Sequence, residues 1–195
     1  MNLPNKLTMI RILLTPVLMI TFYCRLYTLS AVFFVLAALT DLLDGRLARQ
    51  KNLVTTFGKF FDPLADKLIN LTALVLLVSR VTETQAAWYA GLLTVSVCVI
   101  VIREITVTSL RALAASEGIV IAADRLGKLK TVVQDVAIVL MLLDESAVSA
   151  VPFAGQILHW TAVVTLVAAL MLTILSGVHY FTANKELIGK IMKDI

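Results

Sequence analysis

The chain has 195 residues, 59% of them hydrophobic, and a formal net charge of +4. A soluble domain is typically about 45–50% apolar, so this composition excludes an ordinary soluble protein and predicts an all-α integral membrane protein. The length allows a single domain, residues 1–195. Because the basic residues are interleaved with apolar segments, nucleic acid is excluded as a partner.

Six apolar segments follow one another along the chain, separated by polar or basic residues. Their approximate ranges are 7–23, 29–43, 64–79, 86–102, 132–143 and 157–180, after a short polar lead at residues 1–6. A helix needs about 20 residues to cross a bilayer, so several of these segments predict helices whose polar ends lie at membrane depth. The fourth is expected to continue as helix past Ala115. The sequence therefore predicts six transmembrane helices with both termini on one side.

The basic residues predict the orientation of these helices. With six spans, 15 of the 17 Lys and Arg residues lie on the side of the termini, and only Arg25 and Arg80 lie on the other. Basic residues accumulate on the cytoplasmic side, so we expect both termini at the cytoplasmic face of the cell membrane, next to anionic lipid. Aromatic residues near the expected helix ends predict an interfacial belt: Tyr23, Tyr27, Trp88, Tyr89, Trp160 and Tyr180.

Four carboxylates lie on either side of the connection between the second and third segments. Asp41 and Asp44 are three residues apart, Asp62 and Asp66 are four apart, and each pair therefore shares one helix face. Two helix ends that meet at one depth bring the four acids together. Because close carboxylates repel each other, a cation between them is favoured. Their oxygens suit Mg²⁺, Mn²⁺ or Ca²⁺ better than zinc.

Small residues and an arginine accompany these acids. Gly45, Ala48 and Gly58 leave room for a flat group close to the backbone. Arg49 supplies a planar fork of donors suited to phosphate. Carboxylates, a divalent cation and this arginine together indicate phosphoryl chemistry on a nucleotide.

The pattern D-x2-D-G-x2-A-R-x8-G-x3-D-x3-D is the signature of the CDP-alcohol phosphotransferase family. The chain resembles this family at every fixed position: Asp41, Asp44, Gly45, Ala48, Arg49, Gly58, Asp62 and Asp66. The alternative is two unrelated acidic helix ends at a membrane surface. The resemblance implies a six-helix membrane fold, usually a homodimer, and dependence on one or two Mg²⁺ or Mn²⁺ ions.

Other segments resemble the bacterial members of the family that use sn-glycerol 3-phosphate. These segments are N-L-P-N-K-L-T-x2-R, D-P-L-A-D-K, R-E-I-x-V-T-x2-R and G-K-L-K-T. The resemblance implies transfer of a phosphatidyl group from CDP-diacylglycerol to sn-glycerol 3-phosphate, with release of CMP. The acceptor alternatives are serine, inositol phosphate and phosphatidylglycerol. A cation transporter and a non-catalytic scaffold are alternatives from other classes, and a transporter needs polar groups across the whole bilayer.

The implied roles divide the polar residues into three groups. Asp41, Asp44, Asp62 and Asp66 are the expected metal ligands, and Asp66 is also the candidate general base. Residues expected to bind CDP-diacylglycerol are Asn5, Thr8, Gly45, Ala48, Arg49, Thr55 and Gly58. Residues expected to bind the acceptor phosphate are Arg103, Arg111 and Lys128.

Each of several polar residues also has a plain structural interpretation. Asn5 and Thr8 suit the cap of the first helix, and Glu104 and Arg111 share a helix face that suits an intrahelical ion pair. His159 is assigned no catalytic role. Cys24 and Cys98 are interpreted as small apolar fillers and not as metal ligands.

Overall fold

The computed structural model describes the backbone of residues 3–51, 56–116, 121, 125–146, 151–185 and 189, without the side chains of residues 3–5, 41–51, 56–60, 62–63, 66 and 152. Six α-helices make up nearly all of this part of the chain. They are α1 (Leu3–Tyr23), α2 (Tyr27–Lys51), α3 (Thr56–Thr84), α4 (Ala87–Ser116), α5 (Arg125–Asp144) and α6 (Pro152–Ala183). The described residues contain no strand, which confirms the all-α prediction.

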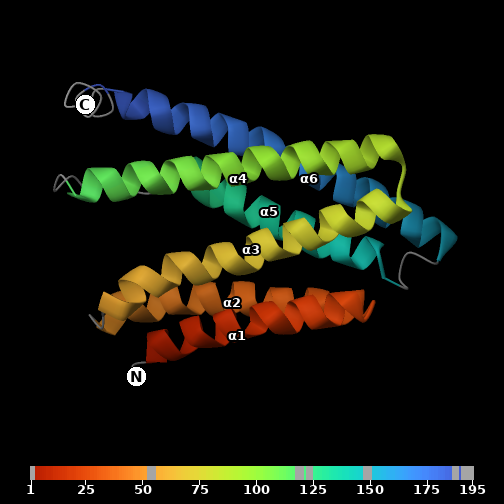
Figure 1. The fold of residues 1–195 in the computed structure, drawn as a ribbon, viewed down its shortest axis with the longest axis horizontal. Coiled ribbons are helices and arrows are strands. Elements are labelled where there is room, and N and C mark those ends of the chain that lie inside the picture. Colours follow the sequence, from red (N-terminus) through yellow and green to blue (C-terminus); the bar gives the residue numbers. More distant parts are fainter. Residues whose placement is uncertain are drawn as a thin grey trace.

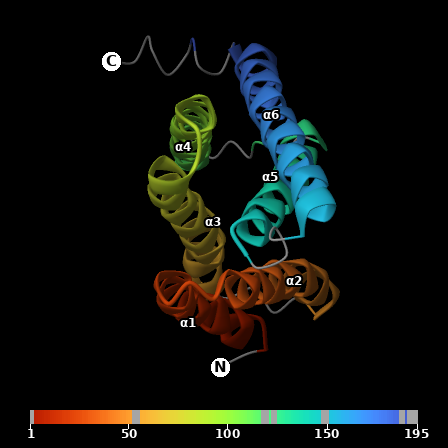
Figure 2. The ribbon, with the colours of Figure 1, turned by 90° about the vertical axis from the view of Figure 1, so that its right-hand side faces the viewer.

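Successive helices run in opposite directions, so the chain crosses the bundle six times (Figure 1). We call the end of the bundle where α2 ends and α3 begins the signature end. Helix α1 begins there, and α6 ends there. The opposite end, where α1 ends and α4 begins, is the far end. Seen along the bundle, α1 and α2 lie to one side and α4 and α6 to the other, with α3 and α5 between them (Figure 2).

Three of the helices are long and apolar enough to cross a membrane. The qualifying segments are Lys6–Tyr23, Ala87–Ser116 and Phe153–Ala183, and Tyr27–Thr40 is a shorter apolar helix segment. Helices α2, α3 and α5 carry more charged residues than α1, α4 and α6. The prediction that the fourth helix continues past Ala115 is confirmed, because α4 ends at Ser116. Helix α1 begins at Leu3, within the polar lead, and is therefore longer than the apolar segment 7–23.

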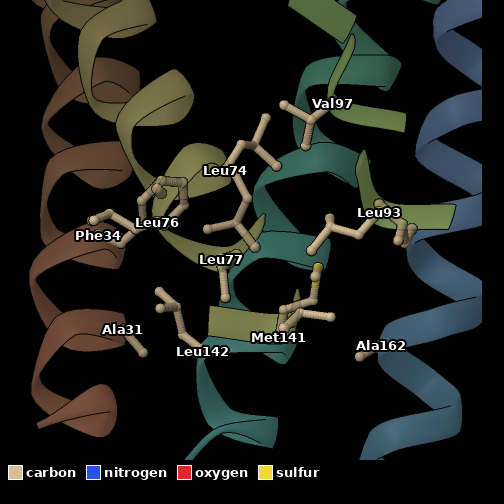
Figure 3. Close-up of a cluster of buried hydrophobic side chains, with 14 of the residues drawn as sticks. Ala31, Phe34, Leu74, Leu76, Leu77, Leu93, Val97, Met141, Leu142 and Ala162 are labelled. Carbon is tan, nitrogen blue, oxygen red and sulfur yellow. The ribbon is translucent and has the colours of Figure 1, made fainter. Parts of the chain in front are cut away.

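A cluster of buried apolar side chains fills the bundle between the signature end and the far end (Figure 3). Phe34 on α2, Leu74 and Leu77 on α3, Leu93 on α4 and Met141 on α5 are each at most 1% exposed. Large apolar side chains also cover the outside of the bundle. Because such side chains face lipid as readily as a core, this cluster stabilises the bundle mainly by close packing and less by removal from water.

The interfacial belt predicted from the aromatic residues is wrong for three tyrosines. Tyr27, Tyr89 and Tyr180 are 6%, 1% and 3% exposed, respectively, and lie inside the bundle. Each faces a polar partner from another helix: Arg80, His159 and Arg111, respectively. The rings therefore contact other helices instead of lipid head groups.

The remaining belt residues do lie on the surface. Trp88 and Trp160 are 52% and 53% exposed, and their rings stack with centroids 6.1 Å apart. Tyr23 is 70% exposed at the end of α1. Cys24 and Cys98, interpreted as small apolar fillers, are both exposed on the outside of the bundle.

Candidate functional site

The signature residues occupy the end of α2 and the start of α3. Helix α2 ends at Lys51 and α3 begins at Thr56. With a rise of about 1.5 Å per residue, Asp44 lies about 10 Å from the end of α2 and Asp62 about 9 Å from the start of α3. Asp41 and Asp66 each lie about 15 Å from those helix ends. Asp44 and Asp62 are thus about equally far from the two helix ends, as are Asp41 and Asp66, and the meeting of the four carboxylates stays a prediction.

The roles predicted for individual signature side chains remain predictions. The side chains of Asn5 and of the eight fixed signature residues lie outside the described part, and Thr55 lies outside it altogether. The four carboxylates form a donor set that fits a hard divalent cation. Among the described side chains, no three His, Cys, Asp or Glu residues gather around one point.

A cavity of about 580 Å³ lies between α1, α2, α3 and α5, next to the signature residues on the side toward the far end. Ala37, which lines it, is one helical turn before Asp41, and Asn70, also in its lining, is one turn after Asp66. Its polar lining residues are Arg11, Asn70, Lys128, Thr131 and Asp135. Its apolar lining residues are Phe34, Ala37, Ala38, Ile69, Val132 and Val136. The cavity therefore joins a polar region, with charges of both signs, to an apolar one.

A cluster of charged side chains lies beside this cavity, around Glu104 of α4. Glu104 Oε1 lies 2.7 Å from Lys130 Nζ and 2.9 Å from Arg103 Nη1, and Glu104 Oε2 lies 3.9 Å from Lys67 Nζ. Lys67 also donates to the hydroxyl of Thr108. We call Lys67, Arg103, Glu104 and Lys130 the Glu104 cluster. It joins α3, α4 and α5 near the signature end.

The ion pair expected between Glu104 and Arg111 is not the arrangement in the structure. Glu104 is surrounded by the cations of its own cluster. Arg111 instead places its guanidinium carbon 5.5 Å from the ring centroid of Tyr180 on α6. A shared helix face gives two residues the chance to meet, but closer partners from neighbouring helices decide the pairing here.

The three residues predicted to bind the acceptor phosphate lie in three different surroundings. Arg103 belongs to the Glu104 cluster, Lys128 lines the cavity, and Arg111 lies against Tyr180. Arg103 and Arg111 are eight residues apart on α4, which is about 12 Å along a helix. All three residues lie toward the signature end of the bundle, but they do not contact one another as a single group.

Thr8 and Arg11 show that α1 contributes to this region. Thr8 is fully buried within α1, five residues after the helix begins, so the expected role as its cap is wrong. Arg11 follows three residues later on the same face and is 1% exposed.

The sequence analysis assigned no role to Arg11, Lys67 or Asn70. A buried arginine in a membrane helix is itself a signal of function, and Lys67 and Asn70 lie one and four residues after Asp66. Lys130 lies in the G-K-L-K-T segment beside Lys128, and only its pairing with Glu104 depends on contact between α4 and α5.

Comparison with known proteins agrees with the signature. The model of the family described as CDP-alcohol phosphatidyltransferase matches residues 1–175. This match covers the signature, the cavity and the Glu104 cluster.

Three relatives extend the similarity over almost the whole chain. A protein of Bacillus subtilis (strain 168) named CDP-diacylglycerol–glycerol-3-phosphate 3-phosphatidyltransferase is 41% identical over 95% of this chain and 96% of its own length. A Rickettsia felis protein of the same name is 35% identical over 95% and 96%, respectively. A Mycobacterium tuberculosis (strain H37Rv) protein named probable phosphatidylglycerophosphate synthase is 37% identical over 97% of this chain and 85% of its own. Together with the signature and the helical bundle, these matches show that the chain belongs to the CDP-alcohol phosphatidyltransferase family.

Proposed function

We propose that the chain transfers the phosphatidyl group of CDP-diacylglycerol to sn-glycerol 3-phosphate, forming phosphatidylglycerol phosphate and CMP. The observation that carries this proposal is the position of the signature at the end of a membrane bundle, with basic residues from α1, α3, α4 and α5 around it. The names of the relatives from Bacillus subtilis and Rickettsia felis support this acceptor.

The signature residues would bind the nucleotide end of the donor. Asp41, Asp44, Asp62 and Asp66 would hold one or two Mg²⁺ or Mn²⁺ ions, which stabilise the charge that develops on the leaving CMP. Arg49 would donate to the diphosphate oxygens. The remaining residues assigned to CDP-diacylglycerol keep this role as a prediction: Asn5, Thr8, Gly45, Ala48, Thr55 and Gly58.

Asp66 would act as the general base. Its carboxylate takes the proton of the glycerol hydroxyl, whose oxygen attacks the phosphorus of the phosphatidyl group. The new P–O bond forms as the bond to the CMP oxygen breaks, and CMP leaves as the anion. A cation held by the same carboxylates would keep Asp66 ionised, so its effectiveness as a base would come from its position beside the hydroxyl.

Basic residues of α4 and α5 would bind the acceptor. A phosphate monoester carries a charge of about −1.5 to −2 at pH 7, and the four signature aspartates repel it. Arg103, Arg111 and Lys128 offset this repulsion from around the approach to the site. An acceptor without net charge, such as zwitterionic serine, would not need all three of these positive charges.

The apolar helices and the family indicate a multi-pass membrane protein. We further propose that it lies in the cytoplasmic membrane with the signature end in the cytoplasm, because 15 of 17 Lys and Arg residues fall on that side. A soluble acceptor then reaches the site from the cytosol, and the lipid donor reaches it laterally. The homodimer that the family resemblance implies stays a prediction.

An acceptor panel tests the proposed function. Purified protein in detergent with labelled CDP-diacylglycerol and Mg²⁺ is given sn-glycerol 3-phosphate, inositol phosphate, serine or phosphatidylglycerol in turn, with an Asp44→Asn preparation as the inactive reference. We expect CMP release and a labelled phosphatidylglycerol phosphate only with sn-glycerol 3-phosphate. Preferred turnover of another alcohol would overturn the acceptor assignment while leaving the reaction class intact.

A cation transporter is the alternative from another class. A carboxylate-lined path would have to continue through the bundle. In the described part of the chain, the space between the signature end and the far end is filled by apolar side chains, including Leu74, Leu77 and Met141 (Figure 3). This packing favours a site at one end of the bundle over a path through it.

A further inference from the structure

Glu104 is the shared partner of three basic residues that come from three helices. Lys130 on α5 and Arg103 on α4 both contact the same carboxylate oxygen, at 2.7 and 2.9 Å. Lys67 on α3 approaches the other oxygen at 3.9 Å and donates to the backbone oxygen of Glu104 at 3.4 Å. Three like charges at this spacing repel one another, so Glu104 is what makes their approach favourable.

The members of the Glu104 cluster differ in exposure. The side chain of Lys130 is 2% exposed, those of Arg103 and Glu104 are 14% and 18%, and that of Lys67 is 24%. Lys130 therefore anchors the carboxylate from the inside, while Arg103 and Lys67 remain reachable. With one carboxylate and three cations, the cluster has an excess of positive charge, which suits a phosphate monoester of charge about −2.

Two glycines make room for Arg103. A Cβ atom on Gly127 of α5 would lie 3.4 Å from Arg103 Nη2, and one on Gly177 of α6 would lie 3.6 Å from Arg103 Cγ. The guanidinium thus passes against the bare backbone of α5, and its stem passes against that of α6. A branched side chain at Gly127 would extend beyond the Cβ position into the space of the guanidinium.

We infer that Glu104 is a positioning residue for the acceptor phosphate, gathering Lys67, Arg103 and Lys130 into one cationic cluster, and that Gly127 keeps open the space through which Arg103 reaches it. The inference rests on the proposed function, because it assumes an acceptor that carries a phosphate. Arg103 and Lys67 present donors to that phosphate. Glu104, Lys130 and Gly127 act through them.

The sign of one kinetic change tests the role of Glu104. If Glu104 merely adds an opposing charge, Glu104→Gln removes a repulsion and lowers KM for sn-glycerol 3-phosphate. If it positions the cations, the neutral amide no longer holds them together and KM rises, by about 10-fold for one lost charge-assisted contact. We expect the rise, with KM for CDP-diacylglycerol unchanged and partial recovery in Glu104→Asp. Glu83→Gln, which alters an exposed acid at the far end, is the matched control.

A graded series at Gly127 tests the space for Arg103 without changing any charge. Gly127→Ala adds a Cβ at an ordinary contact distance and should change KM for sn-glycerol 3-phosphate by no more than about threefold, whereas Gly127→Val should raise it by about 10-fold or more. Gly91→Val is the control, since a Cβ there meets nothing within 4 Å. Stabilisation of each purified variant by sn-glycerol 3-phosphate against thermal unfolding, without CDP-diacylglycerol, reports binding separately from turnover.

The outcomes separate this inference from the proposed function. If the wild-type protein uses sn-glycerol 3-phosphate but Gly127→Val and Glu104→Gln keep its KM within twofold, the positioning role is wrong and the function stands. A fall of KM in Glu104→Gln also overturns the positioning role. If the wild-type protein uses inositol phosphate, the same variants are assayed with that acceptor. If it uses only serine or phosphatidylglycerol in the panel, the inference fails together with the acceptor assignment.

Discussion

Buried charges in this bundle share partners that lie on other helices. Glu104 compensates three basic residues, and at the far end Glu145 accepts hydrogen bonds from Arg80, Thr84 and Gln85 at 2.9, 3.5 and 3.3 Å. An uncompensated charge in a membrane interior is costly, and such sharing lowers that cost. Because each of these acids has several partners, replacing one acid should displace several side chains and give a measurable effect.

At the signature, the loss of one carboxylate should abolish turnover. Asp44→Asn keeps the shape of the side chain but removes a metal ligand and a negative charge. Because metal stabilisation of a leaving group is worth several kcal/mol, we expect CMP release to fall by about 1000-fold or more. The assay is CMP release at saturating substrates, with folding checked by gel filtration in detergent. Normal turnover by folded Asp44→Asn protein, or by wild-type protein in excess chelator, contradicts the metal assignment.

Arg111 and Arg49 should affect different substrates. A charge-assisted hydrogen bond is worth about 1.5–3 kcal/mol, so Arg111→Ala should lower kcat/KM for sn-glycerol 3-phosphate by about 10- to 150-fold. CDP-diacylglycerol binding should change little in Arg111→Ala, and Arg49→Ala should show the reverse pattern. Titration of both substrates with both variants measures this.

The contact of Arg111 with Tyr180 supplies an internal check on this expectation. If Arg111 only packs against that ring, then Arg111→Ala lowers the temperature of unfolding and leaves KM for sn-glycerol 3-phosphate unchanged. Lys185→Ala, an exposed charge just beyond α6, controls for the general loss of positive charge at the signature end.

Among the helices, α5 joins the two sides of the bundle at the far end. Its last residue, Asp144, has its Oδ2 2.7 Å from Nδ1 of His159 on α6, whose ring meets Tyr89 of α4 at 5.0 Å between centroids. The next residue, Glu145, pairs with Arg80 of α3, whose guanidinium lies over Tyr27 of α2. Two consecutive acids therefore connect α5 to the helices on either side of it. His159, which the sequence analysis assigned no catalytic role, therefore has a structural partner in Asp144.

Breaking one of these connections should destabilise the bundle without altering the chemistry. Glu145→Gln leaves Arg80 without its charged partner, at a cost of about 1–3 kcal/mol. We expect a lower temperature of unfolding in detergent but unchanged KM values below that temperature, because the site lies at the signature end. A double-mutant cycle of Glu145→Gln and Arg80→Gln measures the coupling of the pair. A coupling energy near zero would contradict a connecting role.

The whole molecule is organised by six antiparallel helices, which separate its two ends chemically. The signature, the cavity and the Glu104 cluster lie at or next to one end, and the connections of α5 to its neighbours lie at the other (Figure 1). Between them lies the apolar cluster around Leu77 and Met141. This separation lets the far end stabilise the fold while the signature end remains open to its substrates.

The orientation in the membrane can be tested with the natural cysteines. Cys24 is exposed in the turn after α1 at the far end, and Cys98 is exposed on α4 within a span. If the signature end is cytoplasmic, an impermeant maleimide should label Cys24 in cells that have lost their outer envelope layers but keep an intact cytoplasmic membrane. The lipid bilayer should shield Cys98. Labelling should disappear in Cys24→Ser.

A second cysteine gives the reciprocal result. Lys185→Cys, combined with Cys24→Ser, lies just beyond α6 at the signature end. It should react only after permeabilisation. Labelling of Lys185→Cys in intact cells would reverse the orientation and place the signature end outside the cytoplasm.

By itself, the sequence determined the helical class, the six helices, their alternating directions and the position of the aspartates near the ends of α2 and α3. These features follow from local rules. Apolar segments of sufficient length form helices in a membrane because backbone groups must be paired within the segment. Residues three and four apart share a face because a helix turns every 3.6 residues. Asp44 then lies about two turns before the end of α2, and Asp62 about two turns after the start of α3.

Only the tertiary structure decided which side chains meet across helices. Glu104 contacts Lys130 rather than Arg111, Tyr180 faces Arg111 rather than lipid, and Asp144 pairs with His159. The periodicity of a helix sets the direction of a side chain relative to its own helix, but not the rotation and lateral position of its neighbours. Those depend on how all six helices pack together, so partners such as Glu104 and Lys130, 26 residues apart, emerge only from the packed bundle.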